Sequence, residues 1–391
     1  MKKAASFALG CKVNQYESEA IAELFAEKGY EIVGIDEEAD VYVINTCTVT
    51  NFGDKKSRQL IRKVKRQNEN AIVAVVGCYA QTAPKELMEI AGVNLVIGTK
   101  DRAQIVEMVE QYDRANGVEN HVSDIMKERV FEPLSIQKLA NRTRAYLKIQ
   151  DGCSQYCSYC IIPYARGPIR SREPQEVVAE VKRLAENGFK EVVLTGIHVA
   201  SYGKDRRDTS LLDILKQVHE VEGIERIRFS SIEPNVVTEE FAQTMAALPK
   251  VCDHFHLSLQ SGSETVLKRM NRHYTPQQYE EKCNVIRRYF KNPAFTTDII
   301  VGFPAETEEE FEETMQFAEQ IGFSKIHIFK YSMRKGTPAA KMEYQVADSI
   351  KTERSEKLEK LNEKLEENYR RCFLEQEEEV LMEERILVDG Q

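Results

Sequence analysis

Three cysteines stand close together in one short segment, Cys153-Ser-Gln-Tyr-Cys157-Ser-Tyr-Cys160, and are named here the loop cysteines. The C-x3-C-x2-C spacing lets three thiolates on one loop bind three irons of a [4Fe–4S] cube. The fourth iron then has no protein ligand, which is the open position that a reactive cluster needs. A zinc ribbon would require a second cysteine pair or histidines nearby, and none follows at that spacing. The pattern predicts an iron–sulfur site; a chance cluster and a closed zinc knot with a remote fourth ligand are the alternatives.

Three further cysteines, named here the strand-end cysteines, are far apart in sequence: Cys11, Cys47 and Cys78. Each follows, within three residues, a short apolar segment that is typical of a buried parallel strand. These expected strands are residues 3–9, 41–45 and 71–76. Because ligands gather at the carboxyl ends of parallel strands, the three thiols should converge on one edge of a sheet. From the residues alone, a shared metal site and three separate buried cysteines are equally supported. The other cysteines, expected to be packing or surface residues, are Cys252, Cys283 and Cys372.

The chain has 391 residues, nine cysteines and a net charge of −9. Its length predicts two or three domains. The apolar start is interrupted at once by CKVNQYESE, which favours a first strand over a signal peptide, and no apolar run is long enough to span a bilayer. We therefore expect a cytoplasmic protein without a membrane segment, in which regularly spaced cysteines bind metal. The negative charge argues against nucleic-acid binding by the whole surface, but not by a local basic patch.

The N-terminal strands alternate with expected helices at 18–28 and 51–67, and a weaker strand at 94–97 precedes a helix from residue 101. This order predicts an open, parallel α/β domain over residues 1–113. Residues 114–138 have mixed polarity and no clear period, which is typical of a linker.

A second alternating series of strands and helices begins at residue 144. Six strands are expected, at 145–149, 191–195, 226–230, 254–259, 296–301 and 325–330. Six β/α units favour an incomplete (β/α)6 barrel over residues 139–370 rather than the eight units of a complete barrel. A charged amphipathic helix is expected over 348–375, with one apolar face formed by Leu358, Leu361, Leu365 and Tyr369. Residues 371–391 are expected to begin a small β domain.

The segment around the loop cysteines, YLKIQDGCSQYCSYCIIPYARGPIRSR, resembles the radical-SAM superfamily and, within it, the methylthiotransferases. GCKVNQYESE, INTCTVTN and VVGCYAQ resemble signatures of the N-terminal domain of that family, and the resemblance covers nearly all of residues 1–370. It implies that the open iron at the loop cysteines chelates the amino and carboxylate groups of S-adenosylmethionine (SAM), whose cleavage yields a 5′-deoxyadenosyl radical. It also implies a second [4Fe–4S] cluster at Cys11, Cys47 and Cys78, where sulfur or a methylthio group is held for transfer.

The strand ends of the expected barrel carry candidates for SAM contacts, because function collects at that rim. The resemblance implies that Tyr159 lies near the adenine, with ordinary loop packing as the alternative. Gly196 would let the backbone approach SAM. The side chains that could hydrogen-bond its polar groups are Thr195, Glu233, Gln260 and Asp298. Polar and glycine residues also simply terminate strands, and no catalytic side chain is predicted beyond the cluster ligands.

GCKVNQYE and NTCTVTNFGDKKSRQ resemble the methylthiotransferases that modify N6-threonylcarbamoyladenosine at position 37 of tRNA. The resemblance implies transfer of a methylthio group to C2 of that adenine, with one SAM methylating the sulfur and a second supplying the radical. A radical is required because no side-chain base could deprotonate an unactivated aromatic C–H bond. The same chemistry on isopentenyladenosine tRNA, or on a ribosomal-protein aspartate, is the alternative within the family.

A basic run directly after Cys47 is independent support for an RNA partner. On an expected helix it could grip the phosphates of the anticodon loop, although a solvated helix face is the plainer interpretation. Its residues are Lys55, Lys56, Arg58, Arg62, Lys63, Lys65 and Arg66. A second candidate RNA-binding set, just beyond the loop cysteines, is Arg166, Arg170 and Arg172. An external electron donor is the other expected partner, and the chain is expected to be a monomer.

Two hypotheses from other classes are a non-catalytic iron–sulfur electron carrier and a zinc-dependent RNA-binding module. The electron carrier leaves the open irons and the polar barrel rim without a use, and metal analysis separates the zinc module, which would contain zinc without iron. Members of the family usually end in a small RNA-binding β-barrel, the TRAM domain, and residues 371–391 resemble only its beginning. We therefore expect residues 1–391 to hold both clusters and cleave SAM but to bind tRNA weakly.

Overall fold

A six-stranded parallel sheet forms the first part of the computed structural model, which describes residues 1–49, 51–136 and 143–382. The strand order is β2-β1-β3-β4-β5-β6. The strands are β1 (Lys3–Ala8), β2 (Glu31–Ile32), β3 (Val41–Thr46), β4 (Ile72–Gly77), β5 (Leu95–Val96) and β6 (Glu119–Asn120). Because β1, β3 and β4 are neighbours and run parallel, their carboxyl ends meet at one edge of the sheet.

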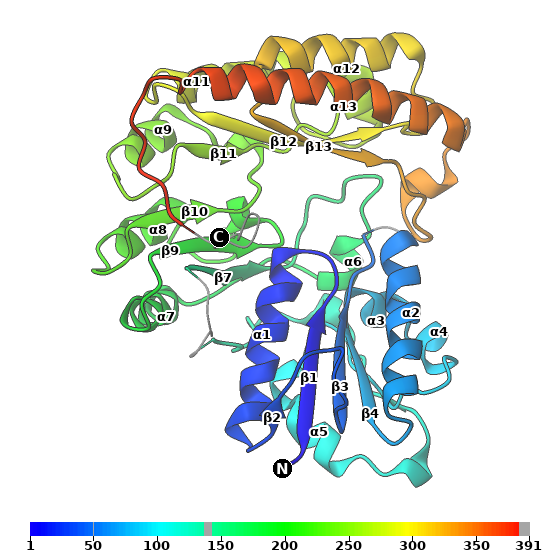
Figure 1. Cartoon of the computed structure of the whole chain (residues 1–391). Coiled ribbons are helices and arrows are strands. Elements are labelled where there is room, and N and C mark those ends of the chain that lie inside the picture. The colour runs from blue at the N-terminus through cyan, green and yellow to red at the C-terminus, as the bar shows by residue number, and fades with distance from the viewer. Residues whose placement is uncertain (50, 137–142, 383–391) are drawn as a thin grey trace, which may run out of the picture.

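Helices cover both faces of this sheet (Figure 1). They are α1 (Lys12–Glu27), α2 (Asn51–Gln67), α3 (Cys78–Thr82), α4 (Pro84–Met88) and α5 (Ile105–Gln111). Buried residues of α1 and α5 pack on one face, and those of α2 and α4 pack on the other. The helix expected at 51–67 is confirmed as α2. The helix expected to start at residue 18 starts at Lys12 instead, because the extended backbone of Cys11 caps it directly after the first strand.

The segment expected as a linker takes part in the structure. Its strand β6 pairs with β5 in parallel. Leu134 and Ile136 are buried in the core of the second domain, and Glu132 binds the buried Arg102. These contacts tie the segment 114–136 to both domains.

Six parallel strands form the second domain, as the sequence predicts. They are β7 (Arg144–Asp151), β9 (Glu191–Gly196), β10 (Arg226–Phe229), β11 (His254–His256), β12 (Ala294–Val301) and β13 (Lys325–Lys330). They form two hydrogen-bonded groups, β10-β9-β7 and β11-β12-β13, and single bridges between Ile227 and Val251 and between Ile232 and Leu257 connect the groups. The short β8 (Arg170–Ser171) lies antiparallel to β7. The fold class, an open parallel sheet followed by an incomplete barrel, is confirmed.

Helices pack on the outer side of this barrel. They are α7 (Pro174–Glu186), α8 (Leu211–His219), α9 (Glu239–Ala246), α10 (Glu264–Arg269), α11 (Pro276–Arg287) and α12 (Glu308–Ile321). Proline occupies the first turn of α7 and α11, and capping boxes begin α11 and α12. A further, short helix, α6 (Ile162–Arg166), follows the loop cysteines directly.

The long helix α13 (Asp348–Arg371) lies beside β13 and α12 (Figure 1). Leu358 and Leu365 are buried there, as their spacing predicts. Asn362 accepts a hydrogen bond from the backbone N–H of Ile326 at 2.7 Å, so the helix covers an edge strand that would otherwise expose its polar groups. Residues 376–382 form no strand, and the rest of the expected β segment lies outside the described residues.

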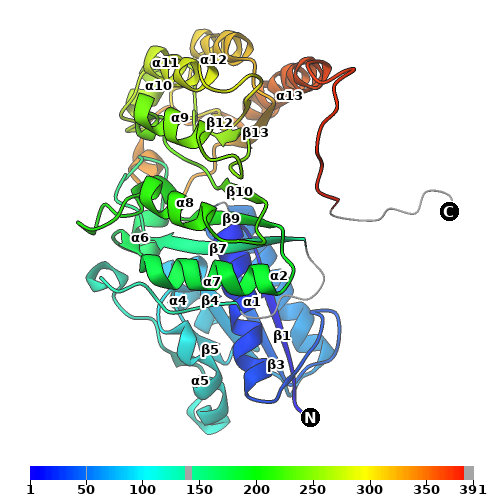
Figure 2. The same cartoon turned by 90° about the vertical axis from the view of Figure 1, so that its left-hand side faces the viewer.

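Helix α1 joins the two domains. Tyr16 and Ala20 belong to the hydrophobic core of the barrel, and the Tyr16 hydroxyl donates to the carbonyl of Leu134 at 2.7 Å. Figures 1 and 2 show the barrel above the N-terminal sheet, with β7 where the two meet. No helix in the described part of the chain is long and apolar enough to cross a membrane.

Candidate iron–sulfur sites and the cavity between them

The loop cysteines lie in a turn that follows β7. Gly152 begins this turn at a φ of +75°, and an added Cβ would stand 1.8 Å from the carbonyl oxygen of Pro168. Burial, together with the neighbouring Cys157, raises the pKa of Cys160 to about 12 and that of Cys153 to about 11. Buried thiols that repel one another when ionised favour a cationic centre among them, so the donor set suits an iron–sulfur cluster.

A buried arginine contacts this set. The Nη1 atom of Arg272 lies 3.2 Å from the sulfur of Cys157, and its Nη2 atom lies 3.7 Å from Glu233. Arg272 comes from the loop after α10, more than one hundred residues away in sequence. Nothing in the spacing of the cysteines indicates this contact, and sequence reasoning missed it.

The strand-end cysteines converge at the edge formed by β1, β3 and β4. Cys11 caps α1, Cys47 follows β3, and Cys78 begins α3. Burial, together with the nearby thiols of Cys78 and Cys11, raises the pKa of Cys47 to about 12. The backbone N–H of Val49 also points to the Cys47 sulfur at 3.5 Å. The three thiols therefore share one electrostatic environment, as expected for ligands of one centre.

Single metal ions and iron–sulfur clusters place their thiolate ligands at different spacings. Within the described ranges, no three His, Cys, Asp or Glu side chains are close enough together to hold one metal ion. In a [4Fe–4S] cube each thiolate binds a different iron, so its ligands stand further apart than those of a zinc ion.

Gly10 keeps space open at the strand-end cysteines. Its φ is +99°, and an added Cβ would stand 2.6 Å from both Cβ and sulfur of Cys47. We predict that Gly10→Ala displaces Cys47 and lowers the iron content to about half of that of the unmodified protein, since one of two clusters is lost. Gly29→Ala is the matched control, because Gly29 has a φ of +84° with no atom within 4 Å of its added Cβ. Equal iron content in both variants, measured after anaerobic reconstitution, would contradict the prediction.

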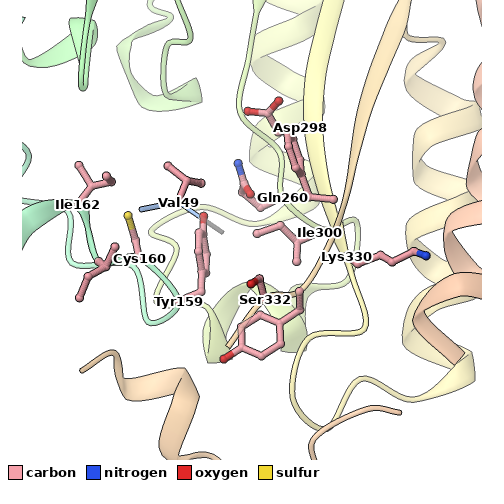
Figure 3. A pocket seen from close by; sticks show the side chains of 12 residues that line it. Val49, Tyr159, Cys160, Ile162, Gln260, Asp298, Ile300, Lys330 and Ser332 are labelled. Atoms are coloured by element: carbon pink, nitrogen blue, oxygen red, sulfur yellow. The ribbon is translucent and has the colours of Figure 1, made fainter. Parts of the chain in front are cut away.

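A cavity of about 210 Å³ connects the two regions. Cys160 and Tyr159 line it from the loop of the first set, and Val49, two residues past Cys47, lines it from the N-terminal domain. Gln260 and Asp298 line it from the barrel. Figure 3 shows Cys160 and Ile162 on one side and Asp298 and Ile300 on the other, with Val49 and Tyr159 between them. A molecule bound here would touch residues adjacent to both cysteine sets.

The predicted SAM contacts divide into two groups. Tyr159, Gln260 and Asp298 line the cavity, and Gln260 is held at a φ of +73° by backbone hydrogen bonds with Asp298 and Ile300. Such a strained conformation is typical of a functional site. The others do not line this cavity: Thr195 is buried in β9, an added Cβ on Gly196 would meet Gln150, and Glu233 accepts from Gln155 at 2.9 Å.

Several cavity residues were not predicted from the sequence. They come from the end of β13 and the residues after it, namely Phe329, Lys330, Tyr331 and Ser332. The carboxyl end of β13 belongs to the same barrel rim as the other strand ends, and this position was the available signal. Phe329 is 44% exposed although it is aromatic, so the wall it forms is open to solvent.

A buried network of charges lies where the two domains meet. Glu17 of α1 is fully buried and pairs with Arg102 at 2.5 Å, Lys148 at 2.7 Å and Arg166 at 2.5 Å. Asp151 binds the same Lys148 at 2.6 Å. Burial by itself would raise the pKa of Glu17, but the three cations hold that pKa well below its usual range. The network joins α1 to β7 and α6.

The burial of three arginines near the domain boundary corrects one prediction about RNA binding. Arg166, Arg170 and Arg172 were expected to bind RNA, yet their exposed fractions are 0%, 2% and 4%. Arg166 pairs with Glu17, Arg170 lies 3.5 Å from Asp151, and Arg172 pairs with Glu180 at 2.6 Å. Their guanidinium groups pair with internal carboxylates and cannot reach phosphates on the surface.

The basic helix α2 has a different environment. Lys55, Lys56 and Arg62 are exposed, whereas Arg58 is half-buried and donates to the Tyr79 hydroxyl at 2.8 Å. A surface groove beside this helix is lined by Phe7, Leu9, Lys56, Gln59, Leu60, Arg62, Lys63 and Arg66. Exposed cations therefore gather on the helix that begins four residues after Cys47.

Comparison with known proteins agrees with this division of the chain. Residues 147–318 match the model of the radical SAM superfamily, and residues 3–98 match the model of an uncharacterised protein family, UPF0004. The first match contains the loop cysteines, and the second contains all three strand-end cysteines.

Relatives of known function cover nearly the whole chain. It is 48% identical over 385 residues to the threonylcarbamoyladenosine tRNA methylthiotransferase MtaB of Bacillus subtilis (strain 168), which covers 98% of this chain and 85% of that protein. It is 37% identical to the tRNA-2-methylthio-N(6)-dimethylallyladenosine synthase of Pelotomaculum thermopropionicum, over 100% of this chain and 87% of the relative.

Among solved structures, the radical SAM methyltransferase TsrM of Kitasatospora setae, with cobalamin and a [4Fe–4S] cluster bound, matches with a TM-score of 0.61. The match covers 87% of this chain and 77% of TsrM at 17% identity, so it supports the fold alone. The sequence relatives, at 48% and 37% identity over nearly the whole chain, also identify the family. The chain belongs to the radical-SAM methylthiotransferase family of tRNA-modifying enzymes.

Proposed function

We propose that the protein adds a methylthio group to C2 of N6-threonylcarbamoyladenosine at position 37 of tRNA. The observation that carries the proposal is a cavity lined both by Cys160 and by Val49, which stands two residues after Cys47. A substrate base in this cavity would meet the radical source and the sulfur source together. The proposal takes its nucleoside from the 48% identity to a threonylcarbamoyladenosine tRNA methylthiotransferase.

The family uses SAM and two [4Fe–4S] clusters, which supply the 5′-deoxyadenosyl radical and the transferable sulfur. In this proposal the loop cysteines hold one cluster and the strand-end cysteines hold the other. Tyr159 packs edge-to-face on Phe303 and presents its ring to the cavity, where it can pack on an adenine. Gln260 and Asp298 supply polar groups that orient SAM, and the side chains of Val49, Ile162 and Ile300 limit the access of water.

The tRNA is proposed to enter with its anticodon loop against the exposed side of α2. Lys56 and Arg62 line the groove there. Their cationic side chains would bind the phosphates of the tRNA backbone, and such contacts position the RNA without reading its base sequence. Electrons come from an external donor in this proposal, and the enzyme acts as a monomer in the cytoplasm, where tRNA is modified.

We predict that the double variant Lys56→Gln/Arg62→Gln weakens tRNA binding and reduces its salt dependence. Each lost phosphate contact should lower the slope of log K against log salt by roughly 0.7–0.9. The control is Lys216→Gln, an exposed lysine of α8 on the far side of the barrel from α2. A salt slope that is the same in the double variant and the control would exclude α2 as the phosphate-binding surface.

Nucleoside mass spectrometry tests the proposed substrate. A deletion strain should lose 2-methylthio-N6-threonylcarbamoyladenosine and accumulate the unmodified threonylcarbamoyladenosine, and the gene should restore the product. The methylthio derivative of isopentenyladenosine should stay unchanged. Loss of that second nucleoside in place of the first would assign the enzyme to the other substrate.

A further inference from the structure

Arg166 links the two candidate cluster sites. It is the last residue of α6, which starts two residues after Cys160, so it belongs to the loop-cysteine region of the barrel. Its side chain nevertheless crosses to the N-terminal domain. The Nε atom lies 3.1 Å from the sulfur of Cys78, and the side chain has an exposed fraction of 0%.

The same guanidinium group binds the loops of the other two strand-end cysteines through Asn14. Its Nη2 atom donates to the Asn14 side-chain oxygen at 2.7 Å. The amide nitrogen of Asn14 in turn donates to the carbonyls of Leu9 at 2.8 Å and Thr46 at 3.1 Å. These carbonyls stand two residues before Cys11 and one residue before Cys47. One arginine and one asparagine therefore hold all three strand-end loops in place.

The charge of Arg166 is also retained next to the sulfur. Glu17 accepts from Arg166 at 2.5 and 3.0 Å, but the same carboxylate is shared with Arg102 and Lys148. An arginine guanidinium stays protonated in proteins, and it can donate to several acceptors from one rigid plane. Hydrogen bonds to cluster sulfurs and nearby positive charge raise the reduction potential of an iron–sulfur centre, because they stabilise its more negative reduced form.

We propose that Arg166 is a positioning residue of the cluster held by the strand-end cysteines, which the barrel supplies across the domain boundary to orient Cys78 and to raise the potential of that cluster. The inference rests on the proposed function, since it requires a cluster at Cys11, Cys47 and Cys78. In this proposal the N-terminal domain supplies the three cysteines, and the barrel supplies the arginine that contacts one of them.

The test uses the full chain in which the loop cysteines are replaced, Cys153→Ala/Cys157→Ala/Cys160→Ala, so that only the strand-end cluster is reconstituted. Into this background we would introduce Arg166→Gln, Arg166→Lys and, as a matched control, Arg172→Gln. Arg172 is another buried arginine near the domain boundary, and it pairs with Glu180 rather than with a cysteine. Iron content and the midpoint potential from an EPR-monitored redox titration are measured for each protein.

Arg166→Gln is expected to shift the midpoint to a more negative potential, while Arg172→Gln leaves it in place. Arg166→Lys retains the charge, so its midpoint should stay closer to that of the background protein, with lower iron content because one ammonium cannot serve Cys78, Asn14 and Glu17 together. If the background binds no iron, the proposed cluster itself is refuted. If iron binds but Arg166→Gln and Arg172→Gln have the same midpoint, or Arg166→Lys shifts as far as Arg166→Gln, the role of Arg166 is refuted.

Discussion

Replacing Cys157 with alanine is expected to reduce the release of 5′-deoxyadenosine from SAM to background while about half of the iron remains bound. Cys157 is buried within the loop after β7, and two remaining thiolates cannot hold a cube whose fourth iron must stay open for SAM. The strand-end cysteines lie on another sheet and should keep their own cluster.

The measurement is chromatography of the nucleosides formed under reducing, anaerobic conditions, together with iron analysis. Cys283→Ala is the matched control, since Cys283 is a fully buried cysteine of α11 that belongs to neither set. It should retain both clusters and normal 5′-deoxyadenosine release. Undiminished release by Cys157→Ala would show that the radical arises elsewhere and would remove the basis of the proposed mechanism.

Replacing Glu17 with glutamine is expected to destabilise the fold by roughly 3–5 kcal/mol, the usual cost of breaking a buried ion pair. The carboxylate is fully buried and pairs with Arg102, Lys148 and Arg166, and without its charge only Glu132 and Asp151 remain to balance these three cations in a dry interior. The free energy of unfolding is obtained from urea titrations. The control is Glu27→Gln at the exposed end of the same helix, which should change stability by about 0.5 kcal/mol or less.

The same variant should alter the pH dependence of stability. Although burial opposes it, the charge of Arg102, Arg166 and Lys148 keeps the pKa of Glu17 well below the usual 4.5 of a free glutamate. A depressed folded-state pKa stabilises the protein above the unfolded pKa, and that contribution is lost as the pH falls toward the folded pKa. The stability difference between the unmodified protein and Glu17→Gln should therefore be full at neutral pH and shrink as the solution is acidified. A difference that is constant down to strongly acidic pH would contradict the ionised state of Glu17.

The position of the strand-end cysteines was predictable from their place in the sequence and from the geometry of parallel sheets. Each cysteine stands just past a short apolar strand, and the carboxyl ends of adjacent parallel strands must meet. The residues alone did not separate a shared site from three separate thiols. The sheet order, with β1, β3 and β4 as neighbours, places the three cysteines at one edge of the sheet, and a shared cluster there stays a prediction.

Arg166 shows where sequence reasoning failed. A run of arginines after a cysteine loop is compatible with a basic surface, and nothing local says otherwise. Its partners, Asn14, Glu17 and Cys78, are between 88 and 152 residues away in sequence. Burial of a charge depends on which segment packs over it, and a distant carboxylate can make that burial favourable.

The amino-acid sequence by itself determined the alternation of strands and helices, the two cysteine sets and the kind of chemistry they support, because strand periodicity and ligand spacing are properties of short segments. Only the tertiary structure decided that one cavity touches both regions, that Val49 and Phe329 line it, and that Arg166 reaches Cys78 across the domain boundary. These features arise from α1 packing against β7 and from the end of β13 lining the same cavity as Cys160, and such arrangements of distant segments are fixed by the packing of the whole chain.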